Sequence, residues 1–208
     1  MSGLLESEQH QPEQRQPEHE VDALFVQRWS PRGFKQAEID HATLKQFFEA
    51  ARWAPSAWNS QPWRFVYALT NTPHWNTLFE TLSEYNQSWA AQASALVLVL
   101  SKKTFLPPNQ QDAVNLTSHS FDTGAAWAHL ALQASLKGWH THAIGGYDQA
   151  QVRQRLHIPE DYQLEAIIVI GQQGSKHHLP QGLQDREQPT PRRSIERFVA
   201  EGKFLFNE

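Results

Sequence analysis

The sequence predicts one domain of the α/β or α+β class, in which helices cover both faces of a single sheet. Strand-like apolar runs alternate with long helical patterns along the chain, and this interleaving is typical of a covered sheet. The longest clean apolar run, at 95–100, has the length of a strand and falls far short of the roughly 20 residues that span a membrane. A chain of 208 residues can bury a core of its own. We therefore expect a single domain without a membrane segment.

The first predicted elements follow a polar segment. Residues 1–20 consist mainly of Gln, Glu, Pro and His, so we expect a disordered tail there and an ordered domain over 21–208. A helix is predicted over 40–53, with Asp40 as its cap and Pro55 beyond its end. The apolar positions of this helix recur at i, i+3, i+4 and i+7, and they are Leu44, Phe47, Phe48 and Ala51.

The later elements are predicted in the same way. Strands are expected over 64–70, 94–101 and 166–171, and helices over 74–84, 119–137, 148–156 and 195–200. Gly138 stands where a helix-ending glycine belongs. Residues 102–118 form a polar, proline-containing connection that is long enough to act as a lid.

Composition excludes several classes of function. The absence of cysteine excludes a disulfide framework, a Cys-based zinc site, an iron–sulfur cluster and a thiol nucleophile. A net charge of −4 argues against a broad nucleic-acid-binding surface. The N-terminus has neither a basic nor an apolar signal region, so we expect a cytoplasmic protein. The pairs His140/His142 and His177/His178 lack partners at metal-site spacing, so no metal site is expected.

Three polar clusters in predicted loops could carry a ligand. Arg28 and Arg32 flank Ser30, and this pattern suits a phosphate, although a solvated basic loop would also explain it. The segment 55–62 carries Ser and amide side chains that could pair with a heterocycle or serve ordinary turn chemistry. The pair at 145–146 is two glycines, which allow close backbone approach to a ligand or simply make a tight turn.

The order and spacing of these pieces resemble the FMN-dependent nitroreductase family. The resemblance extends from about Phe25 to Phe198, and APSAWNSQPW at 54–63 is its most specific part. The other matching pieces are RWSPRGF, DTGAAWAHLALQASLKGWHTHAIGGYD, EAIIVIG and the basic pair Arg192-Arg193. The resemblance implies an α+β fold, an α/β/α sandwich whose mixed, mostly antiparallel sheet is covered by helices. It also implies a homodimer with FMN at the interface, so that 21–208 would be an FMN-binding domain with a C-terminal extension.

The resemblance also assigns residues to the cofactor. Arg28, Ser30 and Arg32 should hold the FMN phosphate and ribityl chain, with Trp29 contributing backbone, and Arg32 could instead reach the pyrimidine edge. Either Arg192 or Arg193 should close on the phosphate. The partner subunit should supply Pro55, Ser56, Ala57, Asn59 and Gln61, while Ile144, Gly145 and Gly146 should lie along the isoalloxazine ring.

Two positions depart from the pattern of some family members. Asn86 is kept, but Trp89 stands where those members carry a lysine near the flavin O2, so the resemblance leaves Arg32 to stabilise the anionic reduced flavin. Gly145 stands where some members carry an acidic residue, and a backbone role survives that change.

The resemblance implies that the chemistry belongs to the cofactor. NAD(P)H would reduce FMN as a transient hydride donor, and a nitroaromatic, quinone or enone would then take the electrons in a ping-pong cycle. No catalytic side chain is assigned, and Tyr85, Trp58, Trp89 and Phe105 are candidates for lining the acceptor pocket or packing in the dimer interface. The alternative is an FMN-binding storage or sensor protein without turnover, whose nicotinamide site is filled by Trp58 or Trp89.

Overall fold

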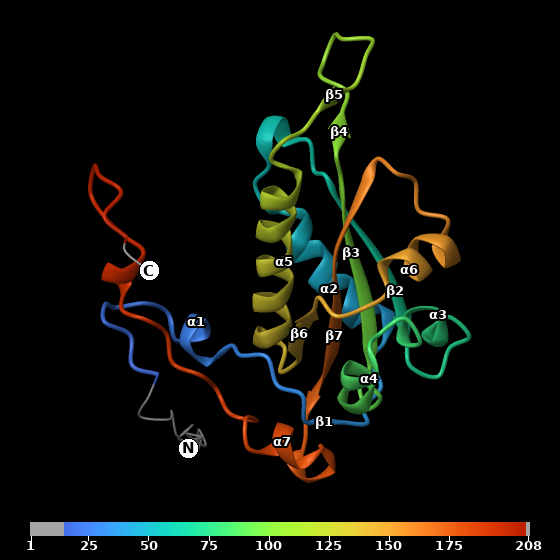
Figure 1. Ribbon diagram of the computed structural model, residues 1–208, viewed down its shortest axis with the longest axis vertical. Helices are drawn as coiled ribbons and strands as arrows, with labels where there is room; N and C mark the ends of the chain where they lie inside the picture. The colour runs from blue at the N-terminus through green and yellow to red at the C-terminus, as the bar shows by residue number, and fades with distance from the viewer. Residues whose placement is uncertain (1–14, 207–208) are drawn as a thin grey trace, which may run out of the picture.

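The protein forms one five-stranded sheet between two layers of helices, which confirms the predicted α+β sandwich. The computed structural model describes residues 15–206 (Figure 1). Every strand pairing within this range is antiparallel, and the sheet order is β1-β7-β3-β2, with β6 also paired to β7. The strands are β1 (Phe34–Lys35), β2 (Trp63–Leu69), β3 (Ala95–Lys102), β6 (His140–Ile144) and β7 (Tyr162–Gln173).

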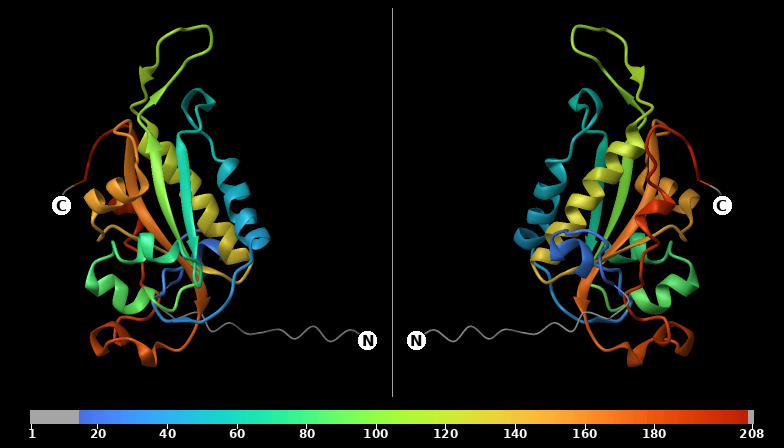
Figure 2. Two further views of the ribbon diagram at one scale, coloured as in Figure 1. Left: turned by 90° about the vertical axis from the view of Figure 1, so that its right-hand side faces the viewer. Right: turned by 90° about the vertical axis from the view of Figure 1, so that its left-hand side faces the viewer.

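Strand β3 lies in the middle of the sheet, and its side chains form the centre of two separate cores. Leu96, Leu98 and Leu100 belong to one core, whereas Ala95, Val97 and Val99 belong to the other. Successive side chains of a strand point to opposite faces, so an uninterrupted apolar strand requires cover on both sides. Figure 2 shows the helices on the two sides of the sheet. One side carries α2 (His41–Arg52) and α5 (His119–Leu136), and the other carries α3 (Trp75–Phe79), α4 (Glu84–Ala90) and α6 (Gln149–Leu156).

The helix ends follow the local signals in the sequence. Asp40 caps α2 by accepting a hydrogen bond from the N–H of Thr43, which confirms the predicted start. Asp148 caps α6 in the same way through Gln151. Gly138 has φ +73° directly after α5, the left-handed conformation that glycine adopts most readily.

Several parts of the structure differ from the prediction. The helix expected over 74–84 is two short helices, α3 and α4, because Ser83 starts a new helix by accepting the N–H of Asn86. Strand β6 was not expected, since its two histidines hide the apolar pattern. The connection 102–118, for which no strands were expected, contains a projecting hairpin of β4 (Thr104–Phe105) and β5 (Val114–Asn115), and its role as a lid stays a prediction (Figure 2).

The two ends of the described chain lie side by side (Figure 1). Residues 1–14 of the expected tail lie outside the described residues, and 15–20 run next to the C-terminal segment instead of standing free. The Glu18 carboxylate accepts hydrogen bonds from the Ser194 hydroxyl (3.2 Å) and the Ile195 N–H (3.0 Å). The remaining short elements are α1 (Ala23–Gln27), η1 (Ala57–Asn59), η2 (Lys176–His178), α7 (Gln181–Gln184) and η3 (Ile195–Arg197).

The C-terminal segment contains less helix than the sequence predicts. The helical segment predicted over 195–200 is only the 3₁₀ turn η3. Val21 and Phe25 are largely exposed in the single chain. No helix in the range 15–206 is long and apolar enough to cross a membrane.

Candidate functional site

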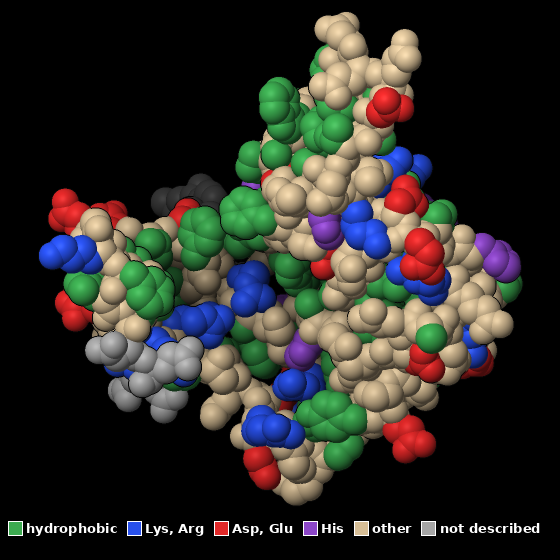
Figure 3. All heavy atoms as spheres, turned by 45° about the horizontal axis from the view of Figure 1, so that its top comes forward, with side chains coloured by type: hydrophobic (Ala, Val, Ile, Leu, Met, Phe, Trp, Pro, Cys, Tyr) green, Lys and Arg blue, Asp and Glu red, His purple; other side chains and the backbone are tan. Residues whose placement is uncertain are grey.

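Arginine side chains gather around a hollow in the surface, with histidine among them (Figure 3). The loop after α1 places Arg28 and Ser30 together, and the Arg28 Nη1 donates to the Ser30 hydroxyl at 3.4 Å. Arg15, from the N-terminal segment, donates through Nη2 to the carbonyl oxygen of Arg28, also at 3.4 Å. Arg192 approaches the same place from the C-terminal segment, since its charge acts on both other guanidiniums. Three separate parts of the chain therefore meet in one cationic cluster.

Within residues 15–206, no carboxylate pairs with the charges of this cluster. Among the described residues, Arg15, Arg28 and Arg192 form no salt bridge within 4.0 Å. Burial lowers the pKa of Arg28, and the neighbouring Arg192 guanidinium lowers the pKa further. Burial and the charges of Arg192 and Arg28 lower the pKa of Arg15 in the same way. Convergent, partly desolvated guanidiniums without counter-ions are suited to bind an anion such as a phosphate.

The position of Arg32 is set by a carboxylate that sequence reasoning missed. Glu187 accepts the backbone N–H groups of Arg32 (2.7 Å) and Gly33 (2.6 Å), and so holds the loop from a distant part of the chain. The Arg32 guanidinium lies over the ring of Trp89, 5.9 Å from its centroid. The Arg32 Nε is buried and has no partner among the described residues, which leaves a donor for a ligand.

The two glycines of the turn after β6 have different surroundings. The carbonyl oxygen of Gly146 accepts hydrogen bonds from Asn86 Nδ2 (2.9 Å) and from the Ser83 N–H (3.1 Å). A Cβ at Gly146 would lie 2.9 Å from Asn86 Nδ2, so a side chain there would displace the amide. A Cβ at Gly145 would meet nothing within 4 Å, so Gly145 faces open space. Ile144 is buried in the core, which leaves only its backbone for a ligand.

Trp89 and Asn86 form part of the floor of this region. Trp89 is fully buried, and its Nε1 donates to Asn86 Oδ1 at 3.2 Å. Asn86 therefore uses both ends of its amide within the chain, one on Trp89 and one on the Gly146 turn. These two bonds connect the Gly146 turn to Trp89 through Asn86.

Two histidines of β6 belong to the cationic region, although the sequence indicated no role for them. The ring of His142 lies 4.7 Å from that of Trp89, and its Nδ1 is 3.0 Å from the carbonyl oxygen of Pro31. Burial lowers the pKa of His142, and the nearby Arg32 acts in the same direction. Burial and the charge of Arg28 lower the pKa of His140. Alternation along β6, with His140 and His142 on one face, was the signal that could have placed them together.

The loop 55–61 lies at the opposite end of the molecule. Figure 1 shows it beyond α2, near the hairpin, whereas the Arg28–Arg32 loop leads into β1 at the other end of the sheet. Asp122 holds this loop, since its Oδ2 accepts the N–H of Ala57 (3.1 Å) and the Ser118 hydroxyl (2.9 Å). The structure thus does not bring these two predicted parts of the site together within one chain.

The conformation of the loop is unusual for its sequence. Trp58, Asn59 and Gln61 have φ values of 57°, 50° and 48°, in the left-handed region that side chains other than glycine rarely adopt. The Ser56 hydroxyl accepts the N–H of Gln61 (3.0 Å), and the Gln61 amide donates to the carbonyl oxygen of Asn59 (3.0 Å). These bonds hold the loop in a shape that leaves the Trp58 side chain 79% exposed. Pro55 is exposed at the start of the loop.

The C-terminal basic pair borders a cavity of about 360 Å³. Arg192 and Arg193 line it together with residues of the N-terminal segment and of α1. Of this pair, Arg192 contributes to the lowered pKa values of Arg15 and Arg28, so we take Arg192 as the member of the pair that acts with the cluster. Its Nη1 also donates to the carbonyl oxygen of Thr190 at 3.1 Å.

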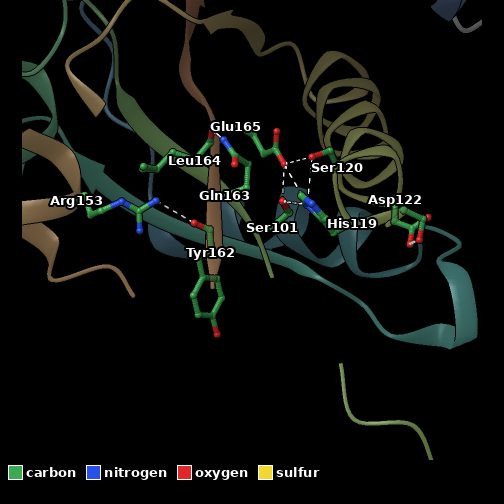
Figure 4. Close-up of polar contacts among 10 residues, drawn as sticks. Ser101, His119, Ser120, Asp122, Arg153, Tyr162, Gln163, Leu164 and Glu165 are labelled. Carbon is green, nitrogen blue, oxygen red and sulfur yellow. Dashed lines mark hydrogen bonds and ion pairs between the residues drawn. The ribbon is translucent and has the colours of Figure 1, made fainter. Parts of the chain in front are cut away.

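A polar cluster near the hairpin was not anticipated (Figure 4). Glu165 Oε1 accepts the hydroxyls of Ser101 and of Ser120, the latter at 2.6 Å. His119 Nδ1 lies 2.7 Å from the Ser101 Oγ and 3.8 Å from Glu165 Oε1. The cluster borders a cavity of about 130 Å³ that Thr123 also lines. Its members come from β3, β7 and α5, so no local sequence pattern could have joined them.

The negative charge of Glu165 reaches the turn after β6. Burial raises the pKa of Tyr147 to about 12, and Glu165 contributes to the increase. The Tyr147 hydroxyl is buried without a partner among the described residues.

Comparisons with known proteins agree with this architecture. A model of the nitroreductase family matches residues 25–74 and 68–172. A crystal structure described as an oxidoreductase containing FMN is 41% identical, with a TM-score of 0.89, and covers 93% of this chain and 97% of that chain. An oxygen-insensitive NADPH nitroreductase of Helicobacter acinonychis (strain Sheeba) is 27% identical over 183 residues, which are 71% of this chain and 85% of that protein.

A Streptomyces coelicolor protein, provisionally named NADH dehydrogenase/NAD(P)H nitroreductase SCO7141, is also 27% identical. The match extends over 179 residues, 77% of this chain and 86% of that protein. The family model alone covers more than half of the chain and includes the Arg28–Arg32 loop, the loop 55–61 and the Gly145–Gly146 turn. The chain belongs to the nitroreductase family.

Proposed function

We propose that this protein is an FMN-dependent oxidoreductase that uses NAD(P)H to reduce a small acceptor such as a nitroaromatic, a quinone or an enone. The observation that carries the proposal is the cluster of guanidiniums that form no salt bridge among the described residues, together with a glycine turn that is open at Gly145. The FMN-containing oxidoreductase and the NADPH nitroreductase that the chain resembles support it.

The residues of the site fit FMN. Arg28, Ser30 and Arg192 would hold the phosphate, because they supply convergent donors with unbalanced positive charge. Arg32 would turn its unpartnered Nε to the ribityl chain or the pyrimidine edge. Gly145 leaves room for the ring to approach the backbone, whereas Gly146 is held from behind by Asn86. Trp29 would contribute its backbone, and Arg193 would remain at the rim.

When bound, FMN supplies a two-electron carrier that accepts hydride from NAD(P)H and passes electrons to the acceptor in a ping-pong cycle. The protein's part is to bind and orient the cofactor and to set the charge around it. Arg32 places a positive charge over Trp89, where some relatives would place a lysine, and this charge would stabilise an anionic ring. No side chain needs to act as a catalytic acid or base, so none is assigned.

We propose further that the active protein is a homodimer in which the partner subunit supplies the loop 55–61. One chain holds this loop and the cationic cluster at opposite ends (Figure 1). The helix α5 exposes Phe121 (83%) and Leu136, and large exposed apolar side chains on one helix are typical of an interface. A two-fold axis at this helix would bring the loop of one subunit, with Pro55, Ser56, Ala57, Asn59 and Gln61, to the cofactor of the other.

In this arrangement the acceptor would meet an aromatic surface. Trp58 and Phe105 stack with ring centroids 6.4 Å apart, one from the loop and one from the hairpin. Flat aromatic acceptors stack well on such a surface. Trp58 would therefore influence which acceptors are reduced.

The alternative function is FMN storage or sensing without turnover. It requires a side chain that blocks the nicotinamide site. Trp89 is enclosed in the core below Arg32, which leaves Trp58 as the candidate for such a block.

The first experiment is to record the visible spectrum of the purified protein and then to add NADPH or NADH without oxygen. A yellow protein that bleaches supports the oxidoreductase. A yellow protein that does not bleach with either nucleotide would favour storage or sensing. A colourless protein that does not take up added FMN would contradict the proposal altogether.

A further inference from the structure

We propose that Arg15 is part of the phosphate-binding site, and that residues 15–19, here called the N-terminal strap, close this site against the C-terminal segment. The inference rests on the proposed FMN site and adds to it a residue from outside the span matched by the family model, which begins at residue 25.

The burial and contacts of Arg15 support this role. Only 9% of Arg15 is exposed, although the segment around it is polar and exposed. Arginine is rarely buried without a partner, because its charge is costly to desolvate. Here the guanidinium reaches the carbonyl oxygen of Arg28 at 3.4 Å, and the other positive charges near it belong to Arg192 and Arg28. Such an arrangement of like charges becomes favourable when an anion binds among them.

The cavity of about 360 Å³ supports the same conclusion. The strap forms one of its walls, and the C-terminal residues Arg192, Arg193, Ile195 and Phe198 form another. The strap and the C-terminal segment therefore meet at a cavity whose charged lining is mainly cationic.

Glu18 joins the two walls. Its carboxylate accepts the Ser194 hydroxyl and the Ile195 N–H, so it is directed to the C-terminal segment and does not pair with Arg15. The one carboxylate in the cavity lining thus fastens the strap, and the arginines of the lining form no salt bridge with any described residue. Within the N-terminal strap, Glu18 therefore anchors the segment and Arg15 is the residue that would bind the phosphate.

The anion that these guanidiniums recognise is a phosphomonoester. We assign it to FMN, because Arg28 connects Arg15 directly to Ser30 and the rest of the proposed cofactor site. The 2′-phosphate of NADPH has the same chemistry, and the experiment must distinguish the two sources.

The test is a titration of the apoprotein with FMN and, separately, with riboflavin, which lacks the phosphate. Quenching of the flavin fluorescence reports binding in both titrations. We expect Arg15→Ala to raise the Kd for FMN by about tenfold, the loss of one charge-assisted hydrogen bond, and to leave the Kd for riboflavin unchanged. Arg15→Lys should recover part of the affinity, since it keeps the charge. Arg52→Ala, which removes an exposed arginine paired with Glu49, is the matched control and should change neither Kd.

A second variant tests the strap. Glu18→Gln should weaken FMN binding by a few-fold and leave riboflavin binding as it is, because it loosens the strap without removing Arg15. Equal losses of FMN and riboflavin affinity in Arg15→Ala would mean that Arg15 supports the fold and would overturn the inference. An unchanged Kd for FMN in Arg15→Ala would also overturn the inference. This holds even if the KM for NADPH rises relative to the KM for NADH, because Arg15 would then bind the 2′-phosphate of NADPH and not FMN. Failure of the unmodified apoprotein to bind FMN would instead contradict the proposed function.

Discussion

The two ends of the sheet differ in how their polar groups are satisfied. At the arginine end, which consists of Arg15, Arg28, Arg32 and Arg192, guanidiniums come together without a salt bridge among the described residues, and the buried Arg32 Nε has no hydrogen-bond partner there. At the loop end, which consists of the loop 55–61 with Asp122 and Glu165 behind it, carboxylates accept hydrogen bonds from the chain itself. The loop end thus has acceptors within the chain for these donors, whereas the arginine end is where we propose that a ligand binds.

The electrostatic effects of the two ends have opposite signs. Arg28 contributes to the lowered pKa of His140 at one end, and Glu165 contributes to the raised pKa of Tyr147 near the other. The Gly145–Gly146 turn is the place proposed for the flavin ring. A redox cofactor that changes its charge during turnover would be sensitive to both.

Replacement of Arg28 should have the largest effect. Arg28→Ala removes the guanidinium that contacts Ser30 and neighbours Arg192, so we expect flavin affinity to fall by about 100-fold. The measurement is the flavin absorbance of the purified protein and the Kd for added FMN. Unchanged flavin content would show that the FMN phosphate binds elsewhere. The difference between the two ends would then not mark the cofactor site.

Replacement of Asp122 tests the loop end. Asp122→Ala leaves the N–H of Ala57 and the Ser118 hydroxyl without their acceptor, and we expect a loss of about 1–3 kcal/mol in the free energy of unfolding. Chemical denaturation measures it. Asp122→Asn keeps an acceptor oxygen and should lose less. If both variants were as stable as the unmodified protein, the loop end would not depend on this carboxylate.

The two glycines of the Gly145–Gly146 turn allow the same substitution to be compared at neighbouring positions with different surroundings. Gly146→Ala forces a Cβ to within 2.9 Å of Asn86 Nδ2, and we expect a destabilisation of about 1–3 kcal/mol. Gly145→Ala meets no atom within 4 Å and should leave stability nearly unchanged. The second variant should nevertheless weaken flavin binding, because the methyl group enters the space proposed for the ring. Equal stability losses would contradict the described turn.

The smallest expected effect concerns Tyr147 and the free energy of unfolding at alkaline pH. Because the fold raises the pKa of Tyr147 from its ordinary value of 10 to about 12, it favours the protonated hydroxyl. That contribution to stability is fully present below pH 10 and is lost as the pH rises through 12. The free energy of unfolding of Tyr147→Phe, measured by chemical denaturation, should therefore decline less between pH 10 and 12 than that of the unmodified protein. Parallel curves for the two proteins would show that Tyr147 titrates normally.

Much of this fold was predictable because its signals are local. The helix α2 and its cap Asp40, the buried strand β3 and the glycine after α5 each depend on residues only a few positions apart. The pattern Arg28-x-Ser30-x-Arg32 was recognisable as a candidate phosphate loop for the same reason. The strand β6 was missed, because polar histidines alternate with its inward-facing residues.

By itself, the amino-acid sequence determined the class of fold, the main elements and the family to which the chain belongs. Only the tertiary structure decided which charges meet. Arg15 and Arg192 are separated by most of the chain, and Ser101, His119 and Glu165 lie on three different elements. Local patterns record what neighbouring residues favour, whereas convergence of distant side chains depends on the packing of the whole sheet and its helices. The unbalanced charge at one end and the satisfied carboxylates at the other are properties of that packing.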